Sequence, residues 1–379
     1  MLAIIGTYWG QFASAVMALV MFVGTTFGLF VPSTTSAAEN YFDENVKNVI
    51  FLIGDGMGFN HLNKTKNERS IELTMDEFDI YGASRTRSTS SSVTDSAAGG
   101  TALATGIRTT NGTIGVYPMD PVGAFSYPKN ITELCLERGM MTGVITTDAT
   151  SGATPASFSA HSSDRGNTAD ITEDQLTSEI DLIWGTANDV ATKADAEANG
   201  FTYITTTAEM MALPEGGRSF AQFTNNLWTL APSDANTPTL SMMARKAIDI
   251  LDDTDEGFFL MIEGAHIDKH SHSNDDAKMT ESLEEFDRTI EYVLEYAKAD
   301  GETLVVITAD HETGAIVAND DGTYSFTSGS HSDANVPVLV YGTKNLIQNG
   351  ETLNNYEIPI RIAYTLGFTE DEFPYEVAA

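Results

Sequence analysis

Three short apolar runs of this sequence each end on a carboxylate, and they constrain the fold more than any other feature. The runs are VIFLIGD, FFLMIE and LVVITAD, which end at Asp55, Glu263 and Asp310. Continuous runs of Val, Ile, Leu and Phe are typical of strands that are buried on both faces of a parallel sheet. In open α/β sheets, ligands bind beyond the carboxyl ends of such strands. We therefore expect the three acids to lie close together.

Histidines beside these acids indicate what the site binds. His311 follows Asp310 directly, and Asp268 and His272 lie four residues apart shortly after Glu263. Carboxylates held close together repel one another unless cations bind among them, and a mixture of oxygen and nitrogen ligands suits zinc. A single acid at the end of a strand would more simply cap a helix or face water. Three of them beside histidines favour a metal site.

The rest of the pattern alternates strands with helices, which predicts an α/β protein with a doubly wound, mostly parallel central sheet and helices on both faces. The glycine-rich turn GDGMG after the first run lets the backbone approach a ligand. Strands are expected at 47–53, 81–87, 142–148, 258–262, 303–307 and 336–342, and helices at 131–138, 240–251, 275–299 and 358–367. Residues 39–379 are interpreted as a single domain. Polar residues 162–235, with a helix expected at 173–183, are interpreted as a surface insertion in it.

The N-terminal segment predicts export. Residues 1–38 contain no Lys, Arg, Asp or Glu, and residues 13–31 form an apolar stretch. The small residues Ala37 and Ala38 match the end of a secretory signal peptide. The apolar stretch is also long enough to cross a bilayer, so an uncleaved membrane anchor stays open as an alternative. In either case we expect a periplasmic, extracellular or cell-surface protein.

Charge and cysteine content narrow the classes of function. The sequence holds 54 acidic and 20 basic residues, a net charge of −34, which argues against a nucleic-acid partner. An anionic substrate would be repelled at long range and would have to be captured by a locally positive pocket. Cys135 is the only cysteine, so no intrachain disulfide can form, and stability depends on burial and on bound metal.

The segment VTDSAAGGTALATG contains the best candidate nucleophile, Ser96, at the expected start of a helix. Backbone N–H groups at a helix N-terminus favour an anion, so a phosphoryl group on the Ser96 hydroxyl would be stabilised there. A free serine hydroxyl is a weak nucleophile, and coordination to a metal would lower its proton affinity. The alternative of a flexible serine tract fits residues 88–92 better than it fits Ser96.

Six segments carry a resemblance when they are taken together and in order: GDGMG, TDSAAGGTALATG, ATPASFSAH followed by Arg165, EGAHIDKHSH, TADHETG and SGSHSDANVPV. They resemble the alkaline phosphatase family over about residues 47–341. The resemblance implies a secreted phosphoric monoester hydrolase that acts on small phosphomonoesters through a phosphoserine intermediate. It also implies two zinc ions and one magnesium ion as cofactors, and a homodimer. Only 19 residues separate His311 from His331, where many relatives carry a long interface-forming insertion, and this spacing weakens the case for the dimer.

The resemblance also assigns roles to individual residues by their positions in the matching motifs. The first zinc would be held by Asp268, His272 and His331, and the second by Asp55, Asp310 and His311. Magnesium would be held by Asp55, Thr154 and Glu263, which offer the hard oxygen donors that this ion prefers. Arg165 would clamp two phosphate oxygens, and Lys269 would reach the phosphate through water. Together, the three metal ions, Arg165 and Lys269 would outweigh the negative charge of the four acidic ligands by about four charges. This surplus of positive charge would attract a phosphate dianion.

Two positions depart from the family pattern. Gly152 stands where some relatives carry Asp or His before Ala-Thr-Pro, so the surroundings of magnesium lack a side chain there. Asp148 could substitute through water, or it could be a surface acid at the end of a strand. The acidic partner that Lys269 has in the family is not evident in this sequence.

Other functions fit the sequence less well. A phosphodiesterase of the same superfamily would usually have Thr as nucleophile and would lack Arg165. A sulfatase would need a Cys or Ser in a Pro/Arg context, whereas Ser96 is followed by two alanines. A non-catalytic extracellular protein that binds metal or phosphate would have no use for Ser96, Arg165 and every expected metal ligand together.

Overall fold

A computed structural model describes residues 36–119, 124–224 and 226–374 of the chain. The described residues from Ala37 onward make up one compact unit. The expected signal peptide or membrane anchor at 1–38 lies almost wholly outside the described residues. Among the residues that are described, no helix is long and apolar enough to span a bilayer.

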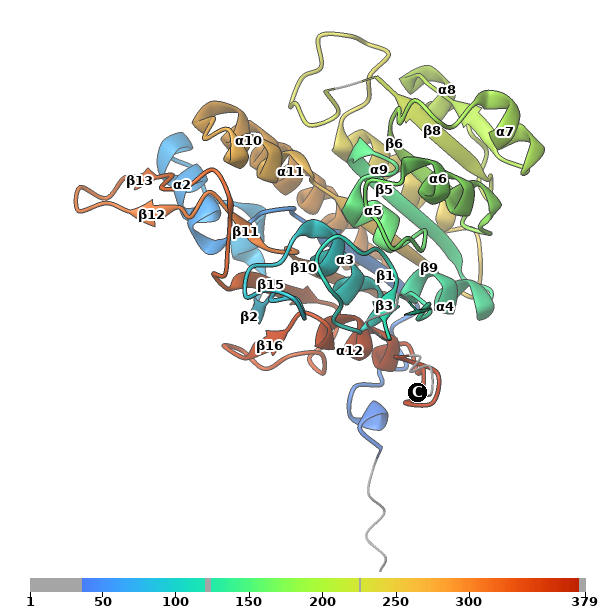
Figure 1. Ribbon diagram of the computed structural model, residues 1–379, viewed down its shortest axis with the longest axis horizontal. Coiled ribbons are helices and arrows are strands. Elements are labelled where there is room, and N and C mark those ends of the chain that lie inside the picture. Colours follow the sequence, from blue (N-terminus) through green and yellow to red (C-terminus); the bar gives the residue numbers. More distant parts are fainter. Residues whose placement is uncertain (1–35, 120–123, 225, 375–379) are drawn as a thin grey trace, which may run out of the picture. The chain divides into compact units, whose positions relative to one another are not determined.

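A ten-stranded sheet forms the centre of this unit, and it is parallel except at β15, which runs antiparallel to β10 and β2 (Figure 1). The strand order is β16-β2-β15-β10-β1-β9-β5-β6-β8-β7. The strands are β1 (Asn48–Ile53), β2 (Ile80–Arg85), β5 (Met141–Ala149), β6 (Leu182–Thr186), β7 (Thr202–Ile204), β8 (Ser219–Phe223), β9 (Phe258–Glu263), β10 (Thr303–Thr308), β15 (Val336–Tyr341) and β16 (Thr352–Asn354). The doubly wound, mostly parallel sheet expected from the sequence is therefore confirmed.

Helices cover both faces of the sheet because alternate residues of each strand point to opposite sides. Ile50 and Leu52 of β1 belong to one buried cluster, which includes residues of α9 and α11. Val49 and Phe51 belong to another, which includes residues of α3, α4 and α12. These helices are α3 (Ser96–Thr105), α4 (Ile131–Glu137), α9 (Leu240–Leu251), α11 (Asp276–Asp300) and α12 (Glu357–Thr365).

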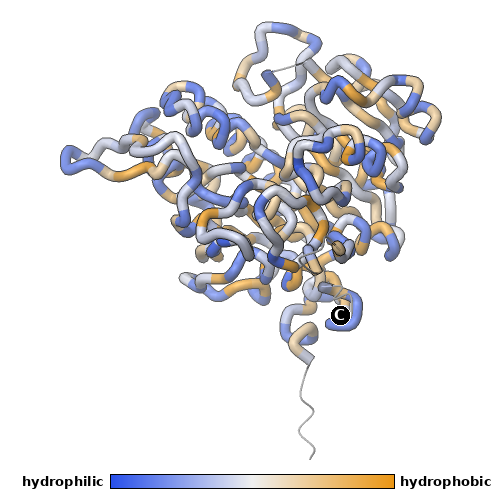
Figure 2. The backbone as a smooth tube through the Cα atoms, in the orientation of Figure 1, coloured by the Kyte–Doolittle hydropathy of each residue, from blue (hydrophilic) through white to orange (hydrophobic). Residues whose placement is uncertain are grey.

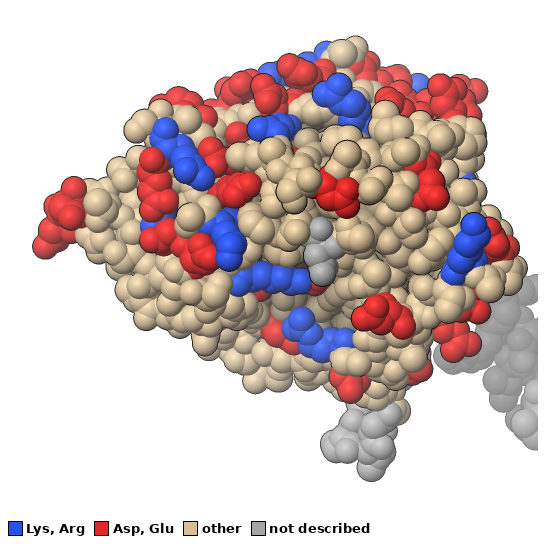
Figure 3. Space-filling model, turned by 90° about the horizontal axis from the view of Figure 1, so that it is seen from above, with Lys and Arg blue, Asp and Glu red and all other residues tan. Residues whose placement is uncertain are grey.

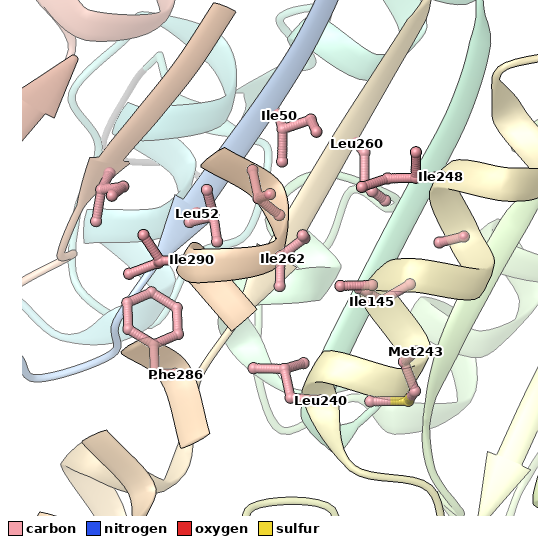
Figure 4. Close-up of a cluster of buried hydrophobic side chains, with 14 of the residues drawn as sticks. Ile50, Leu52, Ile145, Leu240, Met243, Ile248, Leu260, Ile262, Phe286 and Ile290 are labelled. Carbon is pink, nitrogen blue, oxygen red and sulfur yellow. The ribbon is translucent and has the colours of Figure 1, made fainter. Parts of the chain in front are cut away.

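The first of these two clusters shows how the strands are held in place (Figure 4). Phe286 and Ile290 of α11 pack against Leu52 of β1 and Ile262 of β9. Full burial of each such side chain contributes about 1.5–3 kcal/mol to stability. The tube in Figure 2 shows the same layering, with hydrophobic segments inside the unit and hydrophilic ones in its outer turns. The strand ends that carry the acids are thus fixed by burial on both faces.

The segment expected to be a surface insertion, 162–235, instead adds three strands to the central sheet. β6 pairs with β5, and β8 pairs with both β6 and β7. The helix expected at 173–183 is α6 (Thr168–Thr177), and every residue of β6 is buried. These strands are short and mix apolar with small or polar side chains, so no long apolar run marks them.

Shorter elements complete the unit. The helical ones are η1 (Ala38–Asn40), α2 (Phe59–Arg69), η2 (Thr74–Glu77), α5 (Ala153–Ser157), α7 (Lys193–Ala198), α8 (Thr207–Met211) and α10 (His266–His272). Three two-stranded pairs are β3 (Tyr117–Pro118) with β4 (Phe125–Ser126), β11 (Glu312–Thr313) with β14 (His331–Ser332), and β12 (Val317–Ala318) with β13 (Tyr324–Ser325).

Candidate active site

The three strand-end acids meet at one edge of the sheet. β1 lies between β9 and β10, and its last residue, Ile53, is level with Glu263 and Thr308. Burial, followed by the negative charges of Asp310 and other nearby acids including Glu263, raises the pKa of Asp55 well above its usual value. Burial and the charge of Asp148 raise the pKa of Glu263 to about 8. The strand-end acids are therefore close enough for their negative charges to raise one another's pKa values, as expected.

One group of potential metal ligands consists of Asp268, His272 and His331, whose ligand atoms all lie within 4.8 Å of one another. Asp268 and His272 lie one turn apart on α10. His331 reaches them because β14 pairs with β11, where His331 lies opposite Thr313. The His272 and His331 Nε2 atoms are 3.1 Å apart.

The other nitrogen of each imidazole in this group contacts a backbone carbonyl. His272 Nδ1 lies 2.8 Å from the Gly329 oxygen, and His331 Nδ1 lies 2.9 Å from the Thr94 oxygen. Since a carbonyl only accepts, each Nδ1 carries the proton, which leaves the Nε2 lone pairs directed at a common point beside Asp268. Imidazoles held in this way are suited to bind a metal.

A second group consists of Asp55, Asp310 and His311, again with ligand atoms within 4.8 Å of one another. All three side chains are buried, and burial lowers the pKa of His311 to about 3, so that its imidazole is neutral. Asp55 Oδ1 and Asp310 Oδ2 are buried and accept no hydrogen bond from any described residue. Because buried carboxylate oxygens are costly without a partner, a bound cation fits this group.

The Thr154 hydroxyl, on α5, is also buried and has no hydrogen-bond partner among the described residues. Glu263 accepts a hydrogen bond from the Thr146 hydroxyl. An unpartnered oxygen at Thr154 and a buried carboxylate at Glu263 are consistent with binding of a hard cation such as magnesium.

Ser96 is the first residue of α3, and its hydroxyl lies 3.1 Å from His311 Nε2. The helix can approach the metal ligands closely because Gly99 has no side chain. A Cβ atom at Gly99 would lie 2.8 Å from the Asp310 carbonyl oxygen. Small residues in this helix therefore bring Ser96 up to the second ligand group.

Asp95 connects the candidate nucleophile with Arg165. Its side chain accepts a hydrogen bond from the Ala98 N–H and so caps α3. Its other oxygen accepts from the Gly112 N–H at 2.9 Å and from Arg165 Nη1 at 3.0 Å. Asp95 was not among the residues expected at the site, although an Asp directly before a Ser that starts a helix is a capping signal.

Lys269 has an acidic partner after all, because its ammonium group contacts the Asp148 carboxylate. We did not expect one from the sequence. Asp148 lies near the end of β5, and its Oδ2 atom is 2.8 Å from the place where a Cβ atom at Gly152 would lie. The space beside Gly152 is thus filled by Asp148.

Thr313, which was also not expected at the site, contacts both ligand groups. Its hydroxyl donates to Asp268 Oδ1 and lies 3.2 Å from His311 Nδ1. Its backbone N–H donates to the Gly56 carbonyl at 3.0 Å. The other two histidines of α10 contact hydroxyl groups outside both ligand groups: His266 Nδ1 lies 3.1 Å from the Thr147 hydroxyl, and His270 Nδ1 lies 2.9 Å from the Ser282 hydroxyl.

Comparison with known proteins identifies the family. The model of the alkaline phosphatase family matches residues 46–197 and 185–358. The chain belongs to the alkaline phosphatase family. It is 31% identical to alkaline phosphatase 4 of Bacillus subtilis over 326 residues, which are 80% of this chain and 69% of that protein.

Solved alkaline phosphatases share the fold. The enzyme of the Antarctic bacterium TAB5 is 30% identical, with a TM-score of 0.73 over 86% of this chain and 99% of that one. A mutant of the TAB5 enzyme, 31% identical with a TM-score of 0.71 over the same shares of the two chains, was solved with magnesium bound. The protein is accordingly a phosphatase of a metal-dependent family.

Proposed function

We propose that this alkaline phosphatase hydrolyses phosphate monoesters through a phosphoserine intermediate at Ser96. The observation that carries the proposal is the position of the Ser96 hydroxyl, at a helix N-terminus and 3.1 Å from His311 of the second ligand group. Positive charge at the helix N-terminus stabilises an anion on this residue. By contrast, among the described residues no hydrogen bond links the hydroxyl groups of residues 88–92 to either group of ligands.

We further propose two zinc ions and one magnesium ion as cofactors. Asp268, His272 and His331 would hold one zinc, Asp55, Asp310 and His311 the other, and Asp55, Thr154 and Glu263 the magnesium. Bound there, the ions would supply positive charge to the serine oxygen and to the phosphoryl oxygens. The unpartnered oxygens of Asp55, Asp310 and Thr154, together with the Nδ1 contacts of His272 and His331, support this assignment.

Arg165 is proposed to bind two oxygens of the phosphoryl group. Its Nη1 is held by Asp95, and its side chain is 40% exposed, so the rest of the guanidinium can reach a substrate. A planar guanidinium matches the oxygens of a phosphate and orients them. Lys269, held by Asp148, would add positive charge near the bound phosphate.

The distribution of charge supports an anionic substrate. Figure 3 shows the molecule from above, and on that face Lys and Arg side chains are interspersed among Asp and Glu side chains. Arg165 and Lys269 are both partly exposed. In a chain with a net charge of −34, these two basic side chains at the site would favour capture of a phosphate ester at short range.

We also propose that the protein is exported, because of its N-terminal sequence, and that it forms a homodimer, because of its family. Sequencing the N-terminus of the mature protein would distinguish cleavage near Ala38 from an uncleaved anchor through 13–31. Sedimentation would test the dimer.

Hydrolysis of a chromogenic phosphomonoester and of the matching diester tests the catalytic proposal. We expect the monoester to be strongly preferred, activity to disappear after chelation, and zinc with magnesium to restore it. Ser96→Ala should abolish turnover, whereas Ser233→Ala, at an exposed loop serine, should not. Unchanged turnover of the Ser96→Ala protein would rule out Ser96 as the nucleophile.

A further inference from the structure

The serine-rich segment 88–92 forms one wall of a cavity of about 540 Å³, and Arg87 and Arg108 complete it. The segment is held in place by hydrogen bonds. The Thr89 N–H donates to the Thr109 carbonyl at 2.8 Å, and the Asn111 N–H donates to the Ser90 hydroxyl at 2.9 Å. These contacts make the segment an ordered wall of hydroxyl groups, whereas the sequence suggested a flexible tract.

The cavity holds positive charge that no carboxylate neutralises directly. Arg87 is exposed and makes no hydrogen bond or ion pair with any described residue. Arg108 Nη2 donates to Asn354 at 3.2 Å, and its guanidinium lies 4.8 Å from the Tyr356 ring centre. Burial, and next the positive charge of Arg87, lower the pKa of Arg108, so the two arginines act on each other.

Two further features leave this charge available. Arg108 Nε is buried and has no hydrogen-bond partner in the described chain. Glu357, the acid that acts on Arg108, accepts hydrogen bonds from the backbone and side-chain nitrogens of Asn354 at 2.7 and 2.8 Å. Two neighbouring arginines without an ion pair are unexpected in a chain where acids outnumber bases by 54 to 20, because a carboxylate would normally neutralise them.

We propose that Arg87, Arg108 and the hydroxyls of 88–92 form an accessory oxyanion site that binds a phosphate group outside the metal centre. Guanidinium groups match the oxygens of a phosphate in two-pronged contacts. The hydroxyls of Thr89 and Ser92 make no hydrogen bond with any other described residue and can donate to the remaining oxygens. The anion comes either from the product, as inorganic phosphate, or from a chain of phosphate groups on a substrate.

The accessory site is connected to the catalytic residues through two loops. Residues 88–95 run from this cavity to Ser96, and residues 108–112 run beside them. The Asp95 N–H donates to Asn111 Oδ1 at 3.4 Å, and the Gly112 N–H donates to Asp95, which also holds Arg165. The site thus lies on the same pair of loops as the proposed nucleophile but uses different side chains.

Calorimetric titration of the metal-loaded Ser96→Ala protein tests the proposal, with inorganic phosphate in one arm and tripolyphosphate in the other. The ionic strength is kept constant with sodium chloride, because salt screens such binding. We expect a second class of binding site in addition to the metal centre. Arg87→Ala in this background should weaken that second class at least about tenfold, since charged hydrogen bonds are lost.

Arg85→Ala is the matched control, because Arg85 is an exposed arginine two residues away that does not line the cavity. It removes the same charge and should leave both classes of site unchanged. Stronger binding of tripolyphosphate than of phosphate would identify a phosphate chain as the ligand, and similar binding would identify the product. A single class of site in both arms, or equal effects of Arg87→Ala and Arg85→Ala, would overturn the proposal. Neither outcome depends on whether Ser96 is the nucleophile.

Discussion

Replacing Thr313 by valine removes one hydroxyl group that contacts both groups of metal ligands. In the present arrangement the His311 Nδ1–H donates to the Thr313 oxygen, and the Thr313 hydroxyl donates to Asp268 Oδ1. The proton on His311 is thereby held on Nδ1, which leaves the Nε2 lone pair facing Asp310 Oδ2 at 3.2 Å and Ser96 at 3.1 Å. Valine has nearly the same shape as threonine but can neither donate nor accept.

The size of the effect follows from burial. Thr313 is fully buried, so water cannot replace the lost hydrogen bonds. Leaving a buried polar group unsatisfied costs about 1–3 kcal/mol. Loss of a residue that orients metal ligands typically lowers metal affinity about 10–100-fold. We expect a loss of zinc affinity in this range for Thr313→Val, which corresponds to about 1.4–2.7 kcal/mol.

Competition with a chromogenic zinc chelator measures this affinity without any need for catalysis. Thr313→Ser keeps the hydroxyl and should bind zinc nearly as tightly as the wild type. The melting temperature of the metal-free proteins shows whether valine merely disturbs the fold, because a purely structural effect would lower it without changing zinc affinity. Equal zinc affinities of the valine, serine and wild-type proteins would refute the role given to Thr313.

Three further outcomes are expected. Asp95→Asn should retain the helix cap and the melting temperature but raise KM for a phosphomonoester about 3–10-fold, because Arg165 loses its charged partner; an unchanged KM would contradict this. In metal-free protein, burial raises the pKa of Glu263 from its ordinary value of 4.5 to about 8, so the folded state holds the proton more tightly than the unfolded state does. Protonated Glu263 therefore contributes its full stabilisation of the folded state below about pH 4.5, and this contribution is lost as the pH rises toward 8. Over that range the melting temperature should fall more in the wild type than in Glu263→Gln. Finally, a net charge of −34 predicts that the melting temperature rises between low and high salt, and a flat profile would exclude this effect.

Burial determines which parts of the fold could be predicted from the sequence. β1, β9 and β10 are buried along their whole length, so they appear as continuous apolar runs, and the residues that follow them meet at one edge. β6 and β8 are buried as well, but the sequences LIWGT and SFAQF are short and contain small or polar residues. A pattern of five such residues does not distinguish a central strand from a loop segment.

Contacts between distant residues limited what could be predicted of the site. Asp268 and His272 share one side of α10, and the spacing of four residues indicates this directly. Thr313 lies 45 residues from Asp268, and its contact depends on the pairing of β11 with β14, two strands of two residues each. No periodic pattern accompanies such short strands, so the link between the two ligand groups was visible only in the structure.

Asp148 and Gly152 show why a single position is a poor guide to what a site contains. The register of β5 against β6 shifts between Ile145 and Ala149, and the Asp148 N–H donates to the Thr146 hydroxyl at 2.8 Å. In this position Asp148 contacts Lys269, and its Oδ2 atom lies 2.8 Å from where a Cβ atom at Gly152 would be. Any side chain at 152 would therefore displace the carboxylate of Asp148 from its present position. The absence of a side chain at 152 and the ion pair of Lys269 are consequently two parts of one arrangement, in which the carboxylate comes from the end of β5.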